Sequence, residues 1–575
     1  MNNFLNKIKP TVLLFVFLGF TACQSKLEDE FYNPEKQTEP KFDLLFTGAL
    51  QPTELFRLEY GPGYHQARAF NRMLGLGTFP DGGYNGMAPG SYTLWTNWSG
   101  VTLRETQFNK VYVDFNKNIP VMNLLLNNLP EAEKVNYEIY VDCINIVKAF
   151  MFQRLTDIYD DVPFSEANGA YQNKFWAKYD SQESIYHTLL TDLETIEGKL
   201  DGYTLNNSGP HTNFKVADIL NNGDVELWRK FANSLRLRMA MRLTNVEPEL
   251  TKSIVRDIVS NGLPTVSEAN DFIGMAEKDM AHVREYYWPR AFSEMWYNFT
   301  APRFMVRDIF GYKGPATPAN EIDPRLYVVF QPNTFGDYVG CDLWGPNQLA
   351  TAESDMNALG YDASKIQTAK DWNYDDHLEP YFAMYNKMTY NNYNMEYPAF
   401  TPTETNLLLS EAAVRYPGET AGLNAAELYE KAIRASIDWY YSVNATNSFS
   451  TTSTPAIPLN IMDGSQPAKP AESVINAFLD KKVAAFQAMN ASDKIKEIYY
   501  QKFVHLNVLN YWEIWSETRR LMKEYPTLPQ NSVFTWMDRF YYPSSEATTN
   551  PDNFQAVAHK NDHNTPVWWT GRTKN

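Results

Sequence analysis

Apolar residues recur at every third or fourth position through long stretches of this chain, with polar and charged residues between them. The first long block of this kind covers residues 136–159, where Ile144, Val147, Met151, Leu155 and Ile158 fall on one stripe. This spacing is typical of an amphipathic α-helix whose apolar face packs against a core. The same periodicity predicts further helices over residues 181–200, 224–243, 250–259, 403–416, 425–440, 471–489, 493–504 and 507–523.

The regular pattern stops between residues 265 and 400, where Gly, Pro, Asn, Asp and aromatic residues dominate. A gap of this length is usually a functional loop region. Helices on either side form pairs of about 35 to 45 residues with alanine at close-packing positions, which suggests tetratricopeptide-like units, although generic helical packing gives a similar pattern. We therefore expect a mostly α fold of paired helices, whether tetratricopeptide-like or generic in packing, with a large loop-rich insertion. Its helical scaffold would cover residues 41–264 and 401–525, and its loop-rich ligand region residues 265–400 and 526–575.

The N-terminus has the layout of an export signal. Lys7 and Lys9 precede an apolar run over residues 12–20, and the small residues Thr21 and Ala22 lead directly to Cys23. The run is too short to span a bilayer as a helix, and its flanks are those of a secretory signal peptide. The cysteine matches a bacterial lipobox, which predicts a lipoprotein signal peptide over residues 1–22 and lipid on Cys23. An ordinary secretory signal with an incidental cysteine is the alternative. Residues 23–40 would form an acidic tether.

Charge and cysteine content narrow the functional classes. The formal net charge is −17, and removal of Lys7 and Lys9 with the signal gives −17 − 2 = −19. Such a surface repels nucleic acid and anionic head groups, so we expect no nucleic-acid partner and membrane attachment through the lipid alone. Besides Cys23, only Cys143 and Cys341 remain, and Cys143 is expected to be a small buried residue within a helix.

The sequence contains no convincing catalytic or metal-binding motif. The histidines lack metal-ligand spacing, and neither Gly-x-Ser-x-Gly nor a phosphate-binding Gly-x-x-x-x-Gly-Lys is present. Asp371, Asp375, Asp376 and Glu379 could hold a structural calcium ion, but their spacing fits no standard loop. We therefore expect no enzyme activity, no metal site and no cofactor.

Aromatic clusters in loops are the stronger signal. Tyr84, Tyr92, Trp95 and Trp98 lie among glycines, asparagines, serines and a proline, and core burial is harder for such a loop. Trp288 and Trp296 lie early in the predicted insertion, and Tyr338 and Trp344 lie within it. Rigid aromatic faces flanked by amides suit the C–H faces and hydroxyls of a sugar. We expect Trp95 or Trp98, together with Tyr84 or Tyr92, to form a stacking platform and Trp288 or Trp296 the opposite wall, although core packing is the alternative for any single ring.

Five segments together resemble the SusD/RagB family of Bacteroidetes outer-membrane lipoproteins. They occur in the family's order, over residues 150–167, 228–242, 407–415, 512–520 and 565–569. The proline at 163 is expected to stop the first of these helices, and Arg519 and Arg520 to close the fourth, so we interpret these segments as structural rather than ligand-binding.

The resemblance implies a single SusD-like domain over residues 41–575 with four tetratricopeptide-like helix pairs. It also implies a non-catalytic surface protein that binds oligosaccharides and covers a SusC-like TonB-dependent outer-membrane barrel. Peptide binding by the same kind of complex, or a surface glycosidase, are the alternatives.

Overall fold

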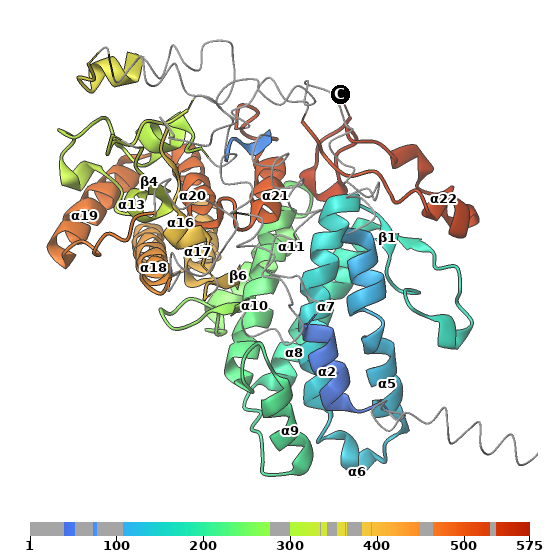
Figure 1. The fold of residues 1–575 in the computed structure, drawn as a ribbon. Coiled ribbons are helices and arrows are strands. Elements are labelled where there is room, and N and C mark those ends of the chain that lie inside the picture. The colour runs from blue at the N-terminus through green and yellow to red at the C-terminus, as the bar shows by residue number, and fades with distance from the viewer. Residues whose placement is uncertain are drawn as a thin grey trace, which may run out of the picture.

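The computed structural model describes residues 40–51, 73–76, 107–276, 292, 300–333, 335–341, 354–362, 364, 382–392, 394–447, 464–528 and 536–574. Helices make up most of this part of the chain, as predicted (Figure 1). The signal peptide and the acidic tether lie outside it, so their boundaries stay a prediction.

Four pairs of consecutive helices form the scaffold. They are α7 (Glu138–Tyr159) with α8 (Gln182–Leu200), α10 (Val225–Arg242) with α11 (Pro248–Ser260), α17 (Pro402–Arg415) with α18 (Ala425–Ala445), and α20 (Ala491–Leu506) with α21 (Tyr511–Leu521). The two members of each pair are in contact, and α19 (Glu472–Ala488) packs on α18. These pairs confirm the predicted arrangement of the scaffold.

Helix α10 lies at the centre of the scaffold. It contacts α7, α8, α11 and α17, and Figure 1 shows it between the two groups of helices on the left and right. From Phe231 onward α10 is therefore covered on all sides, and even Arg238 and Arg242 are buried. Buried cations need partners, and the neighbouring helices supply them.

Several helices begin at a polar residue that caps them. The side chains of Ser181, Asp224 and Thr401 accept hydrogen bonds from the backbone N–H groups of Ser184, Leu227 and Glu404. Each cap satisfies an N–H group that the first helical turn leaves without a partner, which is worth about 1 kcal/mol. The predicted starts of these helices are correct to within two residues.

Helices before residue 136 and the short α9 (Gly209–Ala217) were not predicted from periodicity. Helix α2 (Phe42–Leu50) packs against α5 (Asn118–Asn128), α9 and α7, and buries Phe46 and Leu50 completely. Helix α5 buries only Ile119 and Met122, so its sequence carries a weak stripe. The short α6 (Glu131–Lys134) and a π-helical turn over Lys110–Phe115 complete this group.

The predicted insertion leaves the scaffold and returns to it at one place. Strand β3 (Ile273–Ala276) pairs antiparallel with β6 (Glu396–Phe400), so both ends of the segment between them lie side by side. A side chain at Gly274 would meet Phe272 and the carbonyl oxygen of Tyr397 at 2.3 and 2.4 Å, so this close approach requires glycine. The described part of the insertion contains only short elements: Met305–Ile309, Ala319–Glu321, α13 (Leu326–Val329), β4 (Phe330–Gln331), β5 (Met384–Tyr385) and α16 (Lys387–Tyr390). Strand β4 pairs antiparallel with β5.

The end of α7 differs in mechanism from the expectation. The helix ends at Tyr159, and Asp160 follows with φ 69°, in the left-handed region that most residues avoid. Pro163 lies four residues beyond the last helical residue, in strand β1 (Val162–Pro163), which pairs antiparallel with β2 (Tyr179–Asp180). The turn at Asp160, rather than the proline, therefore ends the helix.

The C-terminal segment packs back on α7. Phe540 N–H donates to the carbonyl oxygen of Ile158, and Trp569 is fully buried. Its short elements are α22 (Glu546–Thr549), α23 (Pro551–Phe554) and turns at Ala558–Lys560 and Trp568–Thr570. Cys143 is fully buried in α7, as expected. Among the described helices, none combines the length and apolarity that crossing a bilayer requires.

Candidate functional site

The residues proposed from sequence as the ligand site lie outside the described residues. These are Tyr84, Tyr92, Trp95, Trp98, Trp288 and Trp296. The same holds for Cys23 and for the acidic group Asp371, Asp375, Asp376 and Glu379. Their proposed roles stay predictions.

One aromatic residue of the insertion, Tyr338, is described and serves in packing. Its ring lies edge-on to the rings of Tyr312 and Tyr327, with centroids 5.4 and 5.6 Å away. The Tyr312 and Tyr361 hydroxyls both donate to Asp337, at 3.2 and 2.6 Å. Tyr338 is half-buried against the core, so for this ring the packing alternative holds.

The five sequence segments that carry the family resemblance meet in one buried network of charges. Arg242 of the second segment donates to Glu513 at 2.5 Å and to Glu517 at 2.6 Å, both on α21. Asp157 of the first segment accepts from the Trp569 indole N–H at 2.7 Å, which adds the fifth segment. Segments hundreds of residues apart are thus joined by side chains that are all buried.

The third segment joins the network through Glu411. Arg520 donates to both carboxylate oxygens of Glu411 at 2.8 Å and also to Glu517. Lys502 donates to Glu517 at 2.8 Å. Burial alone would raise the pKa of Glu411, but Arg520, Lys502 and Arg415 outweigh it and hold this pKa well below its ordinary value. The pKa of Glu517 is likewise lowered, because Arg520, Lys502 and Arg242 outweigh the effect of burial.

Two further arginines fix the edges of the network. Arg238 makes a bidentate contact with Glu404, at 2.7 and 2.8 Å. It also donates to the carbonyl oxygen of Ala399 in β6, where the insertion returns to the scaffold. Arg519 stacks over the Trp515 ring at 3.5 Å and donates to the carbonyl oxygens of Asp157 and Asp538. Charged hydrogen bonds of this kind are strong and geometrically specific.

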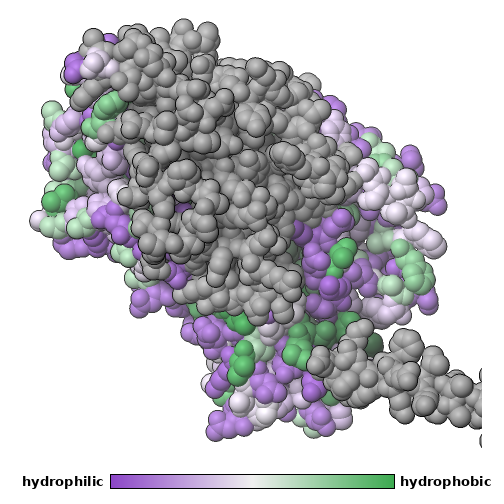
Figure 2. Space-filling view, in the orientation of Figure 1, coloured by the Kyte–Doolittle hydropathy of each residue, from purple (hydrophilic) through white to green (hydrophobic). Residues whose placement is uncertain are grey.

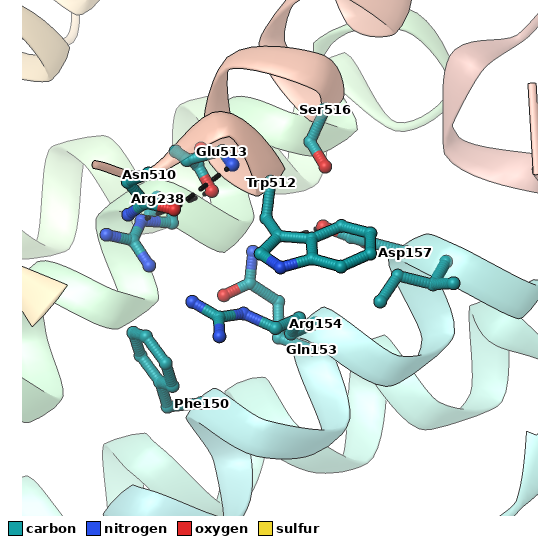
Figure 3. A pocket seen from close by; sticks show the side chains of 10 residues that line it. Phe150, Gln153, Arg154, Asp157, Arg238, Asn510, Trp512, Glu513 and Ser516 are labelled. Atoms are coloured by element: carbon teal, nitrogen blue, oxygen red, sulfur yellow. Dashed lines mark hydrogen bonds and ion pairs between the residues drawn. The ribbon is translucent and has the colours of Figure 1, made fainter. Parts of the chain in front are cut away.

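A small cavity lies beside this network (Figure 3). Figure 3 shows the Trp512 ring lying across it, over Gln153 and Arg154 of α7. Its volume is about 20 Å³, which is room for one water molecule and far below the size of a ligand pocket. Its lining is Phe150, Gln153, Arg154, Asp157, Ile158, Arg238, Asn510, Trp512, Glu513 and Ser516. The five segments therefore form a structural junction, in agreement with their interpretation from sequence.

The carboxylates of the junction are placed to bind cations of the protein itself. Glu404, Glu411, Glu513 and Glu517 each contact an arginine, and all four side chains are buried. On the surface, Glu183, His187 and Glu247 bring donor types of a cation site together, yet His187 Nε2 already lies 2.8 Å from Glu247. A hydrogen bond between the imidazole and the carboxylate is enough to bring these two side chains together.

The most exposed aromatic residues of the described chain were missed by the sequence reasoning. Tyr171, Phe175 and Trp176 are 55, 64 and 65% exposed. They lie on residues 170–178, here called the aromatic loop, which connects β1 to β2. In Figure 1 this teal segment extends away from α7 and α8 at the right edge of the molecule. A Phe-Trp pair among Gln, Asn and Lys, outside any apolar stripe, was the available signal.

Comparison with known proteins now gives the class. The family model of SusD-like proteins, described as starch-binding and associating with the outer membrane, matches residues 88–543. The chain therefore belongs to the SusD-like family. This agrees with the resemblance that the five segments of the junction indicated from sequence. No curated protein sequence matches the chain.

Solved structures agree in fold. A chitin-binding protein is 21% identical, with a TM-score of 0.62 over 92% of this chain and 100% of its own. A SusD homolog from Bacteroides fragilis is 18% identical, with a TM-score of 0.60 over 92% of this chain and 99% of its own. A chitin-binding SusD homolog from Flavobacterium johnsoniae is 20% identical, with a TM-score of 0.59 over 91% and 98%.

Proposed function

We propose that this protein is a surface lipoprotein of the outer membrane that binds oligosaccharides and delivers them to a SusC-like TonB-dependent barrel. The observation that carries the proposal is the family match over residues 88–543, because the family is described as starch-binding and associated with the outer membrane. The two chitin-binding relatives support a glycan ligand. We therefore place malto-oligosaccharides and chitin oligosaccharides first among the ligands to test.

The ligand site proposed here is aromatic. The junction buries several charged and aromatic side chains of the scaffold, and its cavity has no room for a sugar ring. The loop residues Tyr84, Tyr92, Trp95 and Trp98 would form the stacking platform, with Trp288 or Trp296 opposite. Each ring would cover a sugar C–H face while amide side chains satisfy the hydroxyls.

Membrane attachment would run through Cys23. A multiply acylated cysteine holds a protein stably, whereas a single chain binds only marginally. The barrel would receive the ligand beneath a broad contact surface, above the standard size of about 1,600 Å². The junction carboxylates Glu404, Glu411 and Glu513 contact arginines, so we do not propose them as catalytic groups.

A binding screen tests this function. Secreted protein carrying Cys23→Ala would be titrated with malto-oligosaccharides, chitin oligosaccharides and a peptide library, and each glycan mixture would be assayed for new reducing ends. The proposal expects saturable glycan binding and no release of reducing ends. Preferential binding of peptides would favour the peptide-binding alternative, and reproducible release that one carboxylate substitution abolishes would revive the glycosidase.

A further inference from the structure

Exposed large apolar side chains are unevenly distributed over the described residues. The described residues include eight exposed large apolar side chains, all from residues 44 to 216: Leu44, Val113, Leu124, Val135, Tyr171, Phe175, Trp176 and Val216. Figure 2 shows green atoms over α2 and α5 and at the right edge of the molecule, and others along its left edge. Clusters of exposed apolar side chains on a folded protein usually mark a contact site.

The aromatic loop carries three of these eight side chains within six residues, Tyr171, Phe175 and Trp176, and its backbone is held in place. Asn550, which precedes α23, and Asn553 within α23 donate from their side chains to the carbonyl oxygens of Ala177 and Trp176, at 2.8 and 3.1 Å. On the other side, the backbone N–H of Lys178 donates to Glu166 at 3.1 Å. The rings therefore project from a fixed backbone, and a partner would pay little entropy to order it.

The geometry of the rings fits a protein pocket better than a sugar. Phe175 and Trp176 lie edge-to-face, with centroids 6.2 Å apart and planes at 71°, so they do not share one flat face. Phe175 also has no polar atom to meet a hydroxyl. Protruding Trp and Tyr side chains are the residues that most often dominate protein–protein binding.

The charge of the aromatic loop differs from that of the chain. Residues 170–178 contain Lys174 and Lys178 and no acidic residue, whereas the whole chain carries −17. The Lys174 side chain is exposed, with its ammonium 3.9 Å from Glu166. A complementary partner would thus combine an apolar pocket with an acidic rim.

We infer that the aromatic loop anchors the protein to the outer-membrane barrel. Phe175 and Trp176 would insert into an apolar, acid-rimmed pocket on the side of the barrel that faces the cell exterior. This inference rests on the proposed function, because it assigns a surface to the partner named there.

The test begins with the complex itself. The full-length lipoprotein would be extracted from native outer membranes in mild detergent, and the co-extracted barrel identified by mass spectrometry. The purified barrel would then be titrated with wild-type lipoprotein and with the Phe175→Ala/Trp176→Ala variant. We expect the dissociation constant to rise about 30-fold or more, the effect of losing a dominant contact. The melting temperature should stay within about 2 °C, since both side chains are exposed.

Photo-crosslinking places the contact independently. Trp176→p-benzoyl-Phe should form an adduct with the barrel in intact cells. Gln487→p-benzoyl-Phe is the control, because Gln487 is exposed on α19, at the opposite edge of the molecule in Figure 1. An adduct with the barrel from position 176 alone supports the inference.

The outcomes separate this inference from the proposed function. If wild-type protein co-extracts no TonB-dependent barrel, the proposed partner is wrong. If the barrel is present but the double variant binds it normally, the inference is overturned and the proposed function stands. The same holds if position 176 forms adducts only with lipid, polysaccharide or another protein.

Discussion

At the scale of single residues, several charged side chains lie in the buried junction, where water cannot solvate them. Glu517 is buried and receives hydrogen bonds from Arg242, Arg520 and Lys502. Breaking a buried ion pair by removing one partner strands the others in a medium that solvates them poorly. Glu517→Gln should therefore lower the free energy of unfolding by about 3–5 kcal/mol, measured by urea titration. Glu226→Gln, at an exposed position on α10, should change it by less than about 0.5 kcal/mol. Equal effects of the two substitutions would contradict the buried network.

The same carboxylate predicts a response to pH. The pKa of Glu517 is lower in the folded chain than in the unfolded chain, so its stabilisation is fully present above the ordinary carboxyl pKa of about 4.3 and is lost as pH falls below that value. Burial raises the pKa of Asp157 and Glu404, which opposes this trend. Comparing parent and Glu517→Gln isolates the one group. Below pH about 4.3 the parent should lose stability faster, by up to about 1.4 kcal/mol per pH unit. Parallel curves for the two proteins would refute the assignment.

A thiol count tests the proposed lipid on Cys23. The chain contains three cysteines, and a lipid bonded to the Cys23 sulfur removes one thiol. Protein from the outer membrane, denatured and fully reduced, should titrate two thiols, while unprocessed chain made in the cytoplasm should titrate three. Three thiols in protein that still begins at Cys23 would rule out lipidation there.

At the scale of elements, the C-terminal segment is bound by α7. Trp569 is fully buried, and its indole N–H donates to Asp157, whereas the adjacent Trp568 is only half-buried. Trp569→Ala should cost about 3–5 kcal/mol of unfolding free energy, because it leaves a large cavity and removes one hydrogen bond from the buried Asp157. Trp568→Ala should cost less than half of that. If thermal unfolding ranks the two variants equally, the segment does not dock as described.

The elements also show what the sequence could predict. Helices with long apolar stripes and polar caps, such as α8 and α10, begin within two residues of their expected start. Helices α2 and α5 were missed because α2 has only nine residues and α5 buries only two side chains. The end of α7 depends on the conformation of Asp160, which the sequence did not reveal; the nearby proline suggested another cause.

At the scale of the whole molecule, the family segments suggested a common structural role, but the sequence could not show that they meet. Asp157 and Trp569 lie 412 residues apart in sequence and touch only in the folded chain. Arg236, Arg238 and Arg242 lie on a helix whose charged side is buried by neighbours that no local pattern reveals. The exposed rings of the aromatic loop were missed for the converse reason, since periodicity identifies buried faces and is silent about projecting loops.

The central claim is that the protein captures glycans on a stacking platform that contains Trp95 or Trp98, and not on the aromatic loop of residues 170–178. The most direct measurement is calorimetric titration of the best glycan from the screen into the Cys23→Ala parent and into a variant that also carries Trp95→Ala and Trp98→Ala. Losing a stacking ring costs about 1.5–3 kcal/mol, so affinity should fall at least about ten- to hundredfold while the melting temperature barely changes. Phe175→Ala/Trp176→Ala in the same background is the matched control and should bind the glycan normally. Unchanged affinity in the Trp95/Trp98 variant, or a loss of affinity together with a drop of many degrees in melting temperature, would contradict the account.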